Sequence, residues 1–371
     1  MYKLFALLFA IIATPAAHAH LTPNSEVQLI FGPADVRADI IIPQGEYGFA
    51  SGNSVTNDPR AIATARAYLS KRIAVATPAG KPWRIEFQSV EFVQIAGPPD
   101  LHATAQLIPP AGSSPRALSL TWNAVIDTVP NHFALFVAQS DFGGGTMGDT
   151  HEIIGALQGA RRTLVIDRGE RNLFTGFLAA IALGMHHIAE GYDHLLFLLT
   201  LLLPAPVTAA AGRWGQARSR RAAFILLAKI VTAFTIGHSV TLIGAAAFGW
   251  QLPAQPVEIA IALSILVSAI HAWRPLFAGR EPYVAAGFGL IHGLAFASVI
   301  GNLGVGVTEK GLSIFGFNLG IELVQLIVVA VTMPVLMVLA RTRIYPSVRI
   351  AGAVIAGAAA IFWTFDRVVS F

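Results

Sequence analysis

The stretch GMHHIAEGYDHLLFLLTLLLPA, residues 184–205, places ionisable side chains at the head of a long run of leucine and phenylalanine. His186, His187, Glu190, Asp193 and His194 lie within nine residues of one another. Each of these side chains is costly to bury in lipid, so ionisable groups at membrane depth indicate function by default. The stretch therefore predicts a membrane-spanning segment that carries a functional site.

The composition indicates a membrane protein with an exported part. Of the 371 residues, 54% are hydrophobic and 12% are charged, whereas soluble domains are about a quarter charged. Residues 1–19 have the lysine, the apolar run and the Ala-His-Ala end of a secretory signal peptide. Residues 20–168 have the mixed composition of a soluble domain, and residues 169–371 are predominantly apolar. Because the chain has no cysteine, any metal site must use nitrogen and oxygen ligands.

Residues 20–168 are predicted to form an all-β, sandwich-like domain with antiparallel strands, because short alternating runs are separated by Pro- and Gly-rich turns. Asp58-Pro59 is typical of a helix start, so one helix is expected after it. The Gly-rich stretch 141–150 lacks the lysine of a phosphate loop, and we interpret it as a flexible loop. The predicted strands are 27–31, 38–43, 71–77, 83–95, 101–108, 116–122 and 132–138.

Cleavage after residue 19 would make His20 the new N-terminus. A terminal amine and the adjacent imidazole can chelate copper when a second histidine lies nearby, and His102, His132 or His151 are the candidates. This speculative copper site competes with the simpler interpretation that a histidine happens to follow the cleavage position.

Six apolar segments predict an all-α membrane domain of six transmembrane helices. Nine basic residues lie in or beside three alternate connections, against two on the other side. By the positive-inside rule, the exported domain and the C-terminus are then periplasmic in a bacterial inner membrane. The same charge distribution favours lipid topology over nucleic-acid binding. The segments are 172–204, 222–248, 255–273, 283–301, 313–340 and 347–366.

Polar residues on several of these segments lie at similar depth when the spans are laid out in alternating directions, which indicates a shared site rather than separate packing contacts. Imidazole and carboxylate ligands without thiolate suit a divalent transition metal. The candidate metal ligands are His186, His187, Asp193, His194, His238, His292 and Glu322, and the candidates for proton coupling or ligand support are Glu190, Asn318 and Ser239.

The spacing of His187 and His194 constrains this site. Seven residues of unbroken helix separate them by about 10 Å along the axis, which is too far for both to bind one ion. Either the chain breaks at Gly191, or the side chains form successive stations along a path. The 33 residues of 172–204 favour a break, since they exceed one span and fall short of two.

The motif of His187, five intervening residues and Asp193-His194 resembles the signature of the HupE/UreJ family of membrane proteins. The blocks DHLLFLL, FTIGHSVTL, LIHGLAFAS and FNLGIELVQL resemble the variant of that family that has a large exported N-terminal domain. The resemblance implies six spans and a nickel or cobalt permease, or an accessory of nickel-enzyme maturation, with His187, Asp193 and His194 in the metal motif. The motif departs from the family in having Ile188 where proline is usual, and from the related nickel/cobalt permeases by one residue in spacing.

The favoured function is a divalent metal permease or metal-delivery accessory rather than an enzyme. The ligands suit nickel, cobalt, zinc or copper, and the resemblance implies nickel or cobalt as the cargo. The partners expected are the lipid bilayer, the metal ion and a periplasmic or metalloenzyme-maturation protein, with no nucleic acid. One alternative is an intramembrane metal-dependent hydrolase that uses the same ligands to activate water. Another is a metal-binding sensor or anchor that presents the exported domain.

Overall fold

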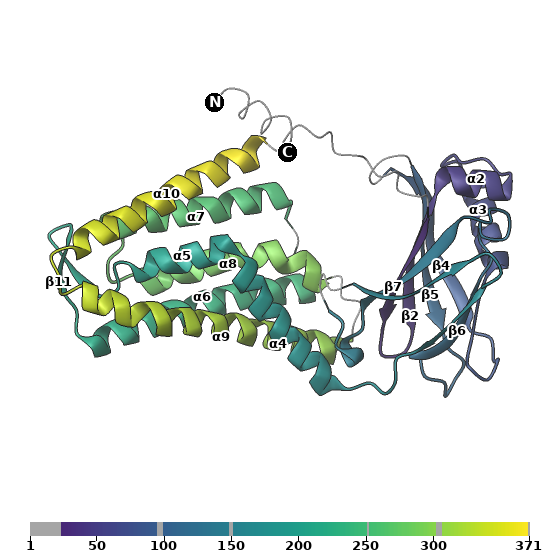
Figure 1. Ribbon diagram of the computed structural model, residues 1–371, viewed down its shortest axis with the longest axis horizontal. Coiled ribbons are helices and arrows are strands. Elements are labelled where there is room, and N and C mark those ends of the chain that lie inside the picture. Colours follow the sequence, from purple (N-terminus) through teal and green to yellow (C-terminus); the bar gives the residue numbers. More distant parts are fainter. Residues whose placement is uncertain (1–23, 95–98, 148–150, 251, 302–305, 370–371) are drawn as a thin grey trace, which may run out of the picture.

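A computed structural model describes residues 24–94, 99–147, 151–250, 252–301 and 306–369, with side chains described for these residues apart from 297–301. All strands from β1 to β9 lie before residue 168, and all helices from α4 to α10 lie after residue 172. Figure 1 shows the β-rich part at one end and the helical part at the other. The predicted fold class, a β-rich N-terminal domain followed by an all-α domain, is confirmed. The predicted signal peptide and His20 lie outside the described residues.

Two sheets build the N-terminal domain. The six-stranded sheet has the order β4-β5-β2-β1-β7-β8, and the three-stranded sheet has the order β3-β6-β9. The strands are β1 (Ser25–Phe31), β2 (Val36–Pro43), β3 (Ile73–Ala76), β4 (Arg84–Val93), β5 (Asp100–Ile108), β6 (Ala117–Trp122), β7 (Phe133–Ser140), β8 (Glu152–Gln158) and β9 (Thr163–Asp167).

The expectation of purely antiparallel strands was wrong at one pair. β1 runs antiparallel to β2 but parallel to β7, with Val27 opposite Phe136. Alternation of apolar residues specifies which face of a strand is buried, and it does not specify the direction of a neighbour that lies a hundred residues away. The strands β8 and β9 were also missed. β8 is largely exposed and has little alternation, whereas β9 alternates but has only five residues.

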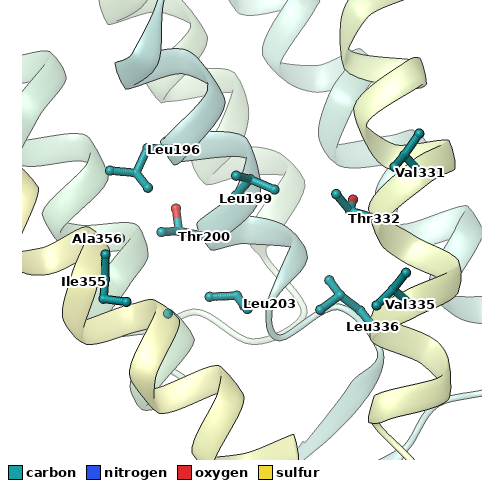
Figure 2. A pocket seen from close by; sticks show the side chains of 11 residues that line it. Leu196, Leu199, Thr200, Leu203, Val331, Thr332, Val335, Leu336, Ile355 and Ala356 are labelled. Atoms are coloured by element: carbon teal, nitrogen blue, oxygen red, sulfur yellow. The ribbon is translucent and has the colours of Figure 1, made fainter.

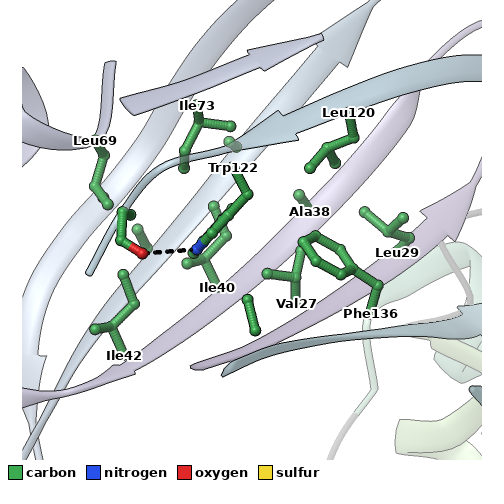
Figure 3. Packing of buried hydrophobic residues seen from close by; sticks show 14 of the residues in the cluster. Val27, Leu29, Ala38, Ile40, Ile42, Leu69, Ile73, Leu120, Trp122 and Phe136 are labelled. Carbon is green, nitrogen blue, oxygen red and sulfur yellow. Dashed lines mark hydrogen bonds between the residues drawn. The ribbon is translucent and has the colours of Figure 1, made fainter. Parts of the chain in front are cut away.

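The inward faces of both sheets share one core, which makes the domain a sandwich. Trp122 of the smaller sheet meets Phe136 of the larger one edge to face, with ring centroids 5.7 Å apart. The buried indole Nε1 donates to the carbonyl oxygen of Ala124 at 2.9 Å, so its polar atom is satisfied (Figure 3). Burial of these apolar faces is the main source of the domain's stability.

Two helices cover this domain. The predicted helix is confirmed as α3 (Pro59–Arg72), where the Asp58 side chain accepts hydrogen bonds from the amides of Arg60 and Ala61. This arrangement satisfies two of the amides that a helix start leaves unpaired. The other helix, α2 (Gln44–Ser51), was not predicted.

The helical domain matches the six predicted segments, with the first divided in two. Within the described residues, five of its helices are long and apolar enough to cross a membrane: α4, α6, α7, α9 and α10. The helix α8 has 21 residues, and α5 has 11. The helices are α4 (Leu173–Glu190), α5 (Tyr192–Leu202), α6 (Arg220–Phe248), α7 (Ala254–Trp273), α8 (Glu281–Gly301), α9 (Val307–Leu339) and α10 (Tyr345–Val369), and a hairpin of β10 (Val207–Ala210) and β11 (Arg213–Ala217) joins α5 to α6.

The short helix α5 leaves an apolar groove between itself, α9 and α10. Figure 2 shows Leu199, Leu203, Val335 and Ile355 around this space, which has a volume of about 400 Å³. Many side chains on the outer faces of the helical domain are likewise large, apolar and exposed. Such surfaces are typical of a protein that is surrounded by lipid, so the chain is a multi-pass membrane protein.

The Gly-rich stretch after β7 packs against the helical domain. Within the described residues 141–147, Asp141 is fully buried and accepts hydrogen bonds from the guanidinium groups of Arg116 and Arg168. The next residue, Phe142, is buried against Gly176 of α4, and it begins the short 3₁₀ helix η1 (Phe142–Gly144). The described residues 141–147 are therefore largely buried and packed against α4, which differs from the flexible loop that we expected.

Candidate metal centre

The first spanning segment breaks at Gly191, as one of the two expected arrangements required. Helix α4 ends at Glu190 and α5 begins at Tyr192, with Gly191 at φ −75° and ψ 83° between them. The break turns the chain so that the ring centroids of His187 and His194 lie 4.9 Å apart. A Cβ at Gly191 would lie 2.8 Å from the carbonyl oxygen of His187 and 2.8 Å from Nδ1 of His194, so the tight turn leaves no room for a side chain.

A third imidazole reaches this pair from α6. Ring nitrogens of His187, His194 and His238 all lie within 4.8 Å of one another. His238 is fully buried, near the middle of its helix. We call these three residues the histidine cluster. Its members come from α4, α5 and α6, so the cluster depends on the packing of these helices as well as on the break.

His292 of α8 adjoins the histidine cluster. Its ring centroid lies 4.7 Å from that of His194, and it is fully buried. One of its nitrogens, Nε2, lies 3.0 Å from the hydroxyl of Ser264 on α7. The other, Nδ1, has no hydrogen-bond partner among the described residues. His292 therefore extends the cluster toward α7 and is held there by a hydroxyl group.

Several ring nitrogens of the cluster are buried and have no hydrogen-bond partner among the residues that the structure describes. Nε2 of His187, Nε2 of His194 and both nitrogens of His238 are buried without a hydrogen-bond partner within the described chain. Buried polar atoms in proteins are nearly always paired, and each exception calls for an explanation. Imidazole nitrogens are common ligands of divalent transition metals, so a cation is the partner that this donor set fits.

Asp193 orients the cluster. One of its carboxylate oxygens, Oδ1, lies 2.9 Å from Nδ1 of His194. A carboxylate accepts hydrogen bonds, so this contact assigns the ring proton to Nδ1 and leaves the lone pair of Nε2 directed into the cluster. The other oxygen, Oδ2, lies 3.4 Å from the guanidinium of Arg367 on α10. Asp193 thus acts on the cluster through His194.

Glycine residues let the supporting helices approach closely. A Cβ at Gly289 of α8 would lie 2.2 Å from a backbone oxygen of α6, and one at Gly237 of α6 would lie 2.1 Å from a backbone oxygen of α8. A Cβ at Gly184 of α4 would lie 2.0 Å from the backbone of α9. Small residues at such contacts are typical of helix packing in membranes. They fix the distance between the helices that carry the histidines.

An aromatic wall encloses the cluster on one side. Phe296 and Phe317 stack with ring centroids 4.3 Å apart, and they lie 4.7 and 5.3 Å from the ring of His187. Apolar walls exclude water and lower the local dielectric constant, which strengthens the attraction between a cation and its ligands. On this side the cluster is therefore bounded by apolar rings, and its polar contacts lie elsewhere.

The structure does not bring every candidate to the cluster. His186 is exposed and lies 2.9 Å from the carboxylate of Glu190, one turn further along the same helix. Glu322 is half-buried on α9 and has no hydrogen-bond or ion-pair partner in the described part of the chain. Ser239 donates to a carbonyl oxygen of its own helix. Asn318 is buried; its side-chain nitrogen donates to its own helix, and its side chain also adjoins His238 of the cluster.

Two contacts of the site were not predicted from the sequence. Arg367 was counted only as a charge beyond the last span, yet its side chain reaches Asp193 and also the carboxylate of Glu258, 3.5 Å away. Ser264 of α7 was not among the candidate site residues, yet its hydroxyl contacts His292. No pattern in the sequence indicates that a charge near the end of the last helix contacts a residue of α5.

The comparisons with known proteins agree with this architecture. The family model described as HupE / UreJ protein matches residues 161–367, which include all of the helices from α4 to α9 and most of α10. No curated protein and no solved structure matches the chain. Membership of this family suggests a role in membrane metal transport or as an accessory to it, and it implies a link to transition metals. The matched region covers more than half of the sequence, and the chain belongs to the HupE/UreJ family.

Proposed function

We propose that this protein is a permease for divalent transition metals, with nickel or cobalt as its cargo, and that the histidine cluster binds the ion within the membrane. The observation that carries the proposal is the set of buried, unpaired nitrogens on His187, His194 and His238. A broken helix at membrane depth supports it, because discontinuous helices commonly form the ion sites of transporters. Zinc and copper suit the same ligands and are the alternative cargoes.

The site is suited to passage of an ion rather than to its permanent retention. Three imidazoles leave further coordination positions of a divalent metal open to water or to the next ligand. His292, with its unpaired Nδ1, lies directly beside the cluster and is the candidate for that next ligand. An ion can then exchange ligands stepwise instead of losing all of them at once.

The protein is placed in a bacterial inner membrane with the β domain and the C-terminus in the periplasm. The predicted signal peptide and the positive-inside distribution support this orientation. The arginine-bearing hairpin of β10 and β11 lies at the end of the helical domain opposite the β domain (Figure 1). The β domain is the proposed contact for a periplasmic or metalloenzyme-maturation partner.

The test is metal uptake into proteoliposomes that contain the purified full-length protein. Wild type should take up nickel or cobalt, and His187→Ala should abolish the uptake. His186→Ala is the matched control, because this neighbouring histidine is exposed and directed away from the cluster; it should transport like wild type.

Absence of uptake by wild type would refute the permease. If metal binding through His187 persisted in that case, the hydrolase and sensor alternatives would take its place. A hydrolase would then release product from ester or peptide substrates only when metal is present.

A further inference from the structure

A row of buried polar side chains lies between α7 and α8 and leads away from the histidine cluster. On α7 the buried polar residues are Ser264, Ser268 and His271, at spacings of four and three that place them on one face. On α8, Glu281 and His292 are eleven residues apart, which is about three helical turns and also one face. We call these five residues the α7–α8 seam.

The two helices meet through these residues at both ends of the seam. At one end, the Ser264 hydroxyl lies 3.0 Å from Nε2 of His292, beside the histidine cluster. At the other end, Nε2 of His271 lies 4.0 Å from a carboxylate oxygen of Glu281. Between them, Ser268 donates to the carbonyl oxygen of Ser264. The seam therefore connects the cluster with the end of the bundle opposite the β domain.

The far end of the seam is buried and incompletely paired. His271 is 0% exposed and Glu281 is 4% exposed. Nε2 of His271 and Oε2 of Glu281 have no hydrogen-bond partner among the described residues. His271 lies near the end of its span, yet it does not reach toward water. A buried carboxyl group without a full set of partners is costly, so it indicates a function.

The hydrogen bonds of His271 decide which ligand this pair can take. Nδ1 of His271 accepts from the backbone amides of Leu276 and Phe277, at 3.2 and 3.3 Å. An accepting nitrogen carries no proton, so the proton of the neutral ring lies on Nε2 and faces Glu281. An N–H group repels a metal ion and donates to a carboxylate. The pair is therefore suited to a proton and unsuited to the metal cargo.

The geometry around the pair leaves the Glu281 carboxylate, rather than His271, with an open position for a proton. A second proton on His271 would have to displace the two amides at Nδ1. Arg349 of α10 is the nearby cation, and its guanidinium donates to the carbonyl oxygens of Ala272 and Trp273 and lies over the ring of Trp214.

The other polar and charged groups nearby are also engaged or exposed. Trp214 donates to the carbonyl oxygen of His271, and Phe277 stacks on the imidazole at 3.7 Å. Tyr345 donates to the carbonyl oxygen of Leu203. Arg274 and Arg280 are exposed. Among the described residues, Glu281 thus has the N–H of His271 as its only nearby side-chain donor.

We propose that Glu281 binds the proton that this permease exchanges for its metal cargo, and that the α7–α8 seam couples it to the histidine cluster; this rests on the proposed function. The proton forms an O–H bond with the Glu281 carboxylate and later returns to water, so no other reactant is required. A divalent ion in the cluster and a proton on the seam repel each other through a medium of low dielectric constant. Metal entry therefore releases the proton, and metal release allows it to bind again.

The experiment measures metal and proton movement together in proteoliposomes that contain the full-length protein and a pH-sensitive dye in the lumen. Wild type should show a change in luminal pH when nickel or cobalt enters, and it should accumulate metal when the lumen is made acidic. Glu281→Gln, which resembles the protonated state, should lose this accumulation. It should still exchange external labelled metal for metal already inside. Glu170→Gln removes an exposed carboxylate outside the bundle and should behave like wild type.

Each outcome separates the coupling from the permease itself. If wild type exchanges metal but the luminal pH stays constant, the proton coupling is overturned and the permease stands. If Glu281→Gln still accumulates metal in response to an acidic lumen, the assignment to Glu281 is overturned. If wild type exchanges no metal, the proposed function fails. The wild-type pH signal decides the coupling even if a variant does not fold.

Discussion

Replacing His238 with leucine should stabilise the metal-free protein. Both ring nitrogens of His238 are buried without a partner among the described residues. Leaving a buried polar group unsatisfied costs about 1–3 kcal/mol. Leucine has a similar volume and no polar atom, so His238→Leu should raise the metal-free unfolding free energy by about this amount. Most core substitutions destabilise, so the opposite sign is a specific signature of a site built for a ligand.

The same substitution should remove the stabilisation by metal. A ligand present at 100 times its dissociation constant stabilises the folded state by about 2.7 kcal/mol. Wild type should show a gain of this order with nickel or cobalt, and His238→Leu should show little or none. For a domain of roughly 200 residues, each kcal/mol corresponds to about 2–4 °C in the midpoint of thermal unfolding. Both effects are therefore measurable by tryptophan fluorescence in detergent, with and without a chelator.

A second variant guards against a general effect of removing a histidine. His186→Leu changes an exposed side chain outside the cluster, so neither the metal-free midpoint nor the metal-induced shift should move. The reasoning is refuted if metal-free His238→Leu unfolds at a lower temperature than wild type. It is refuted equally if the variant keeps the full shift with metal.

Three further predictions follow from contacts around the site and in the β domain. Gly289→Ala should destabilise the protein by about 1–3 kcal/mol and weaken metal binding, because the added Cβ would overlap the backbone of α6. The control is Gly287→Ala on the same helix, whose added Cβ meets no atom within 4 Å and which should leave thermal unfolding unchanged. Arg367→Gln should weaken metal binding, measured by calorimetry, because it releases the Asp193 carboxylate that orients the imidazole of His194. Arg367→Lys keeps a positive charge and should restore part of the affinity. The pKa of Glu152 lies below its ordinary value of 4.5 because a neighbouring arginine donates to its carboxylate. The stability that this pairing contributes should be lost as the pH falls from about 4.5 through the lower folded pKa. Glu152→Gln should lack this pH-dependent loss of stability when thermal unfolding is measured across that range.

Much of the helical domain was predictable because the physical signals are local and strong. Apolar runs of span length predicted the helices. The spacing of His187 and His194 left two arrangements open, and the length of the first segment favoured the one with a break at Gly191. The depth of the polar residues predicted that His238 and His292 would lie near this break. These inferences needed only helix geometry and the cost of burying polar groups.

Other features depend on contacts between distant parts of the chain. The sequence does not indicate that His187 faces inward while His186 faces outward, because the rotation of a helix with apolar residues on every face is set by its neighbours. The contact of Arg367 with Asp193 joins residues 174 positions apart. The burial of Asp141 likewise arises from two arginines that other strands and loops supply.

The central claim is that the three imidazoles of the histidine cluster bind one metal ion. The most direct test is X-ray absorption at the metal edge of purified full-length protein loaded with one equivalent of nickel or cobalt. We expect scattering from about three imidazole nitrogens at about 2.0–2.1 Å, reduced in His187→Ala and in His238→Leu and unchanged in His186→Ala. A first shell made only of oxygen atoms, or a spectrum that neither cluster variant alters, would contradict it.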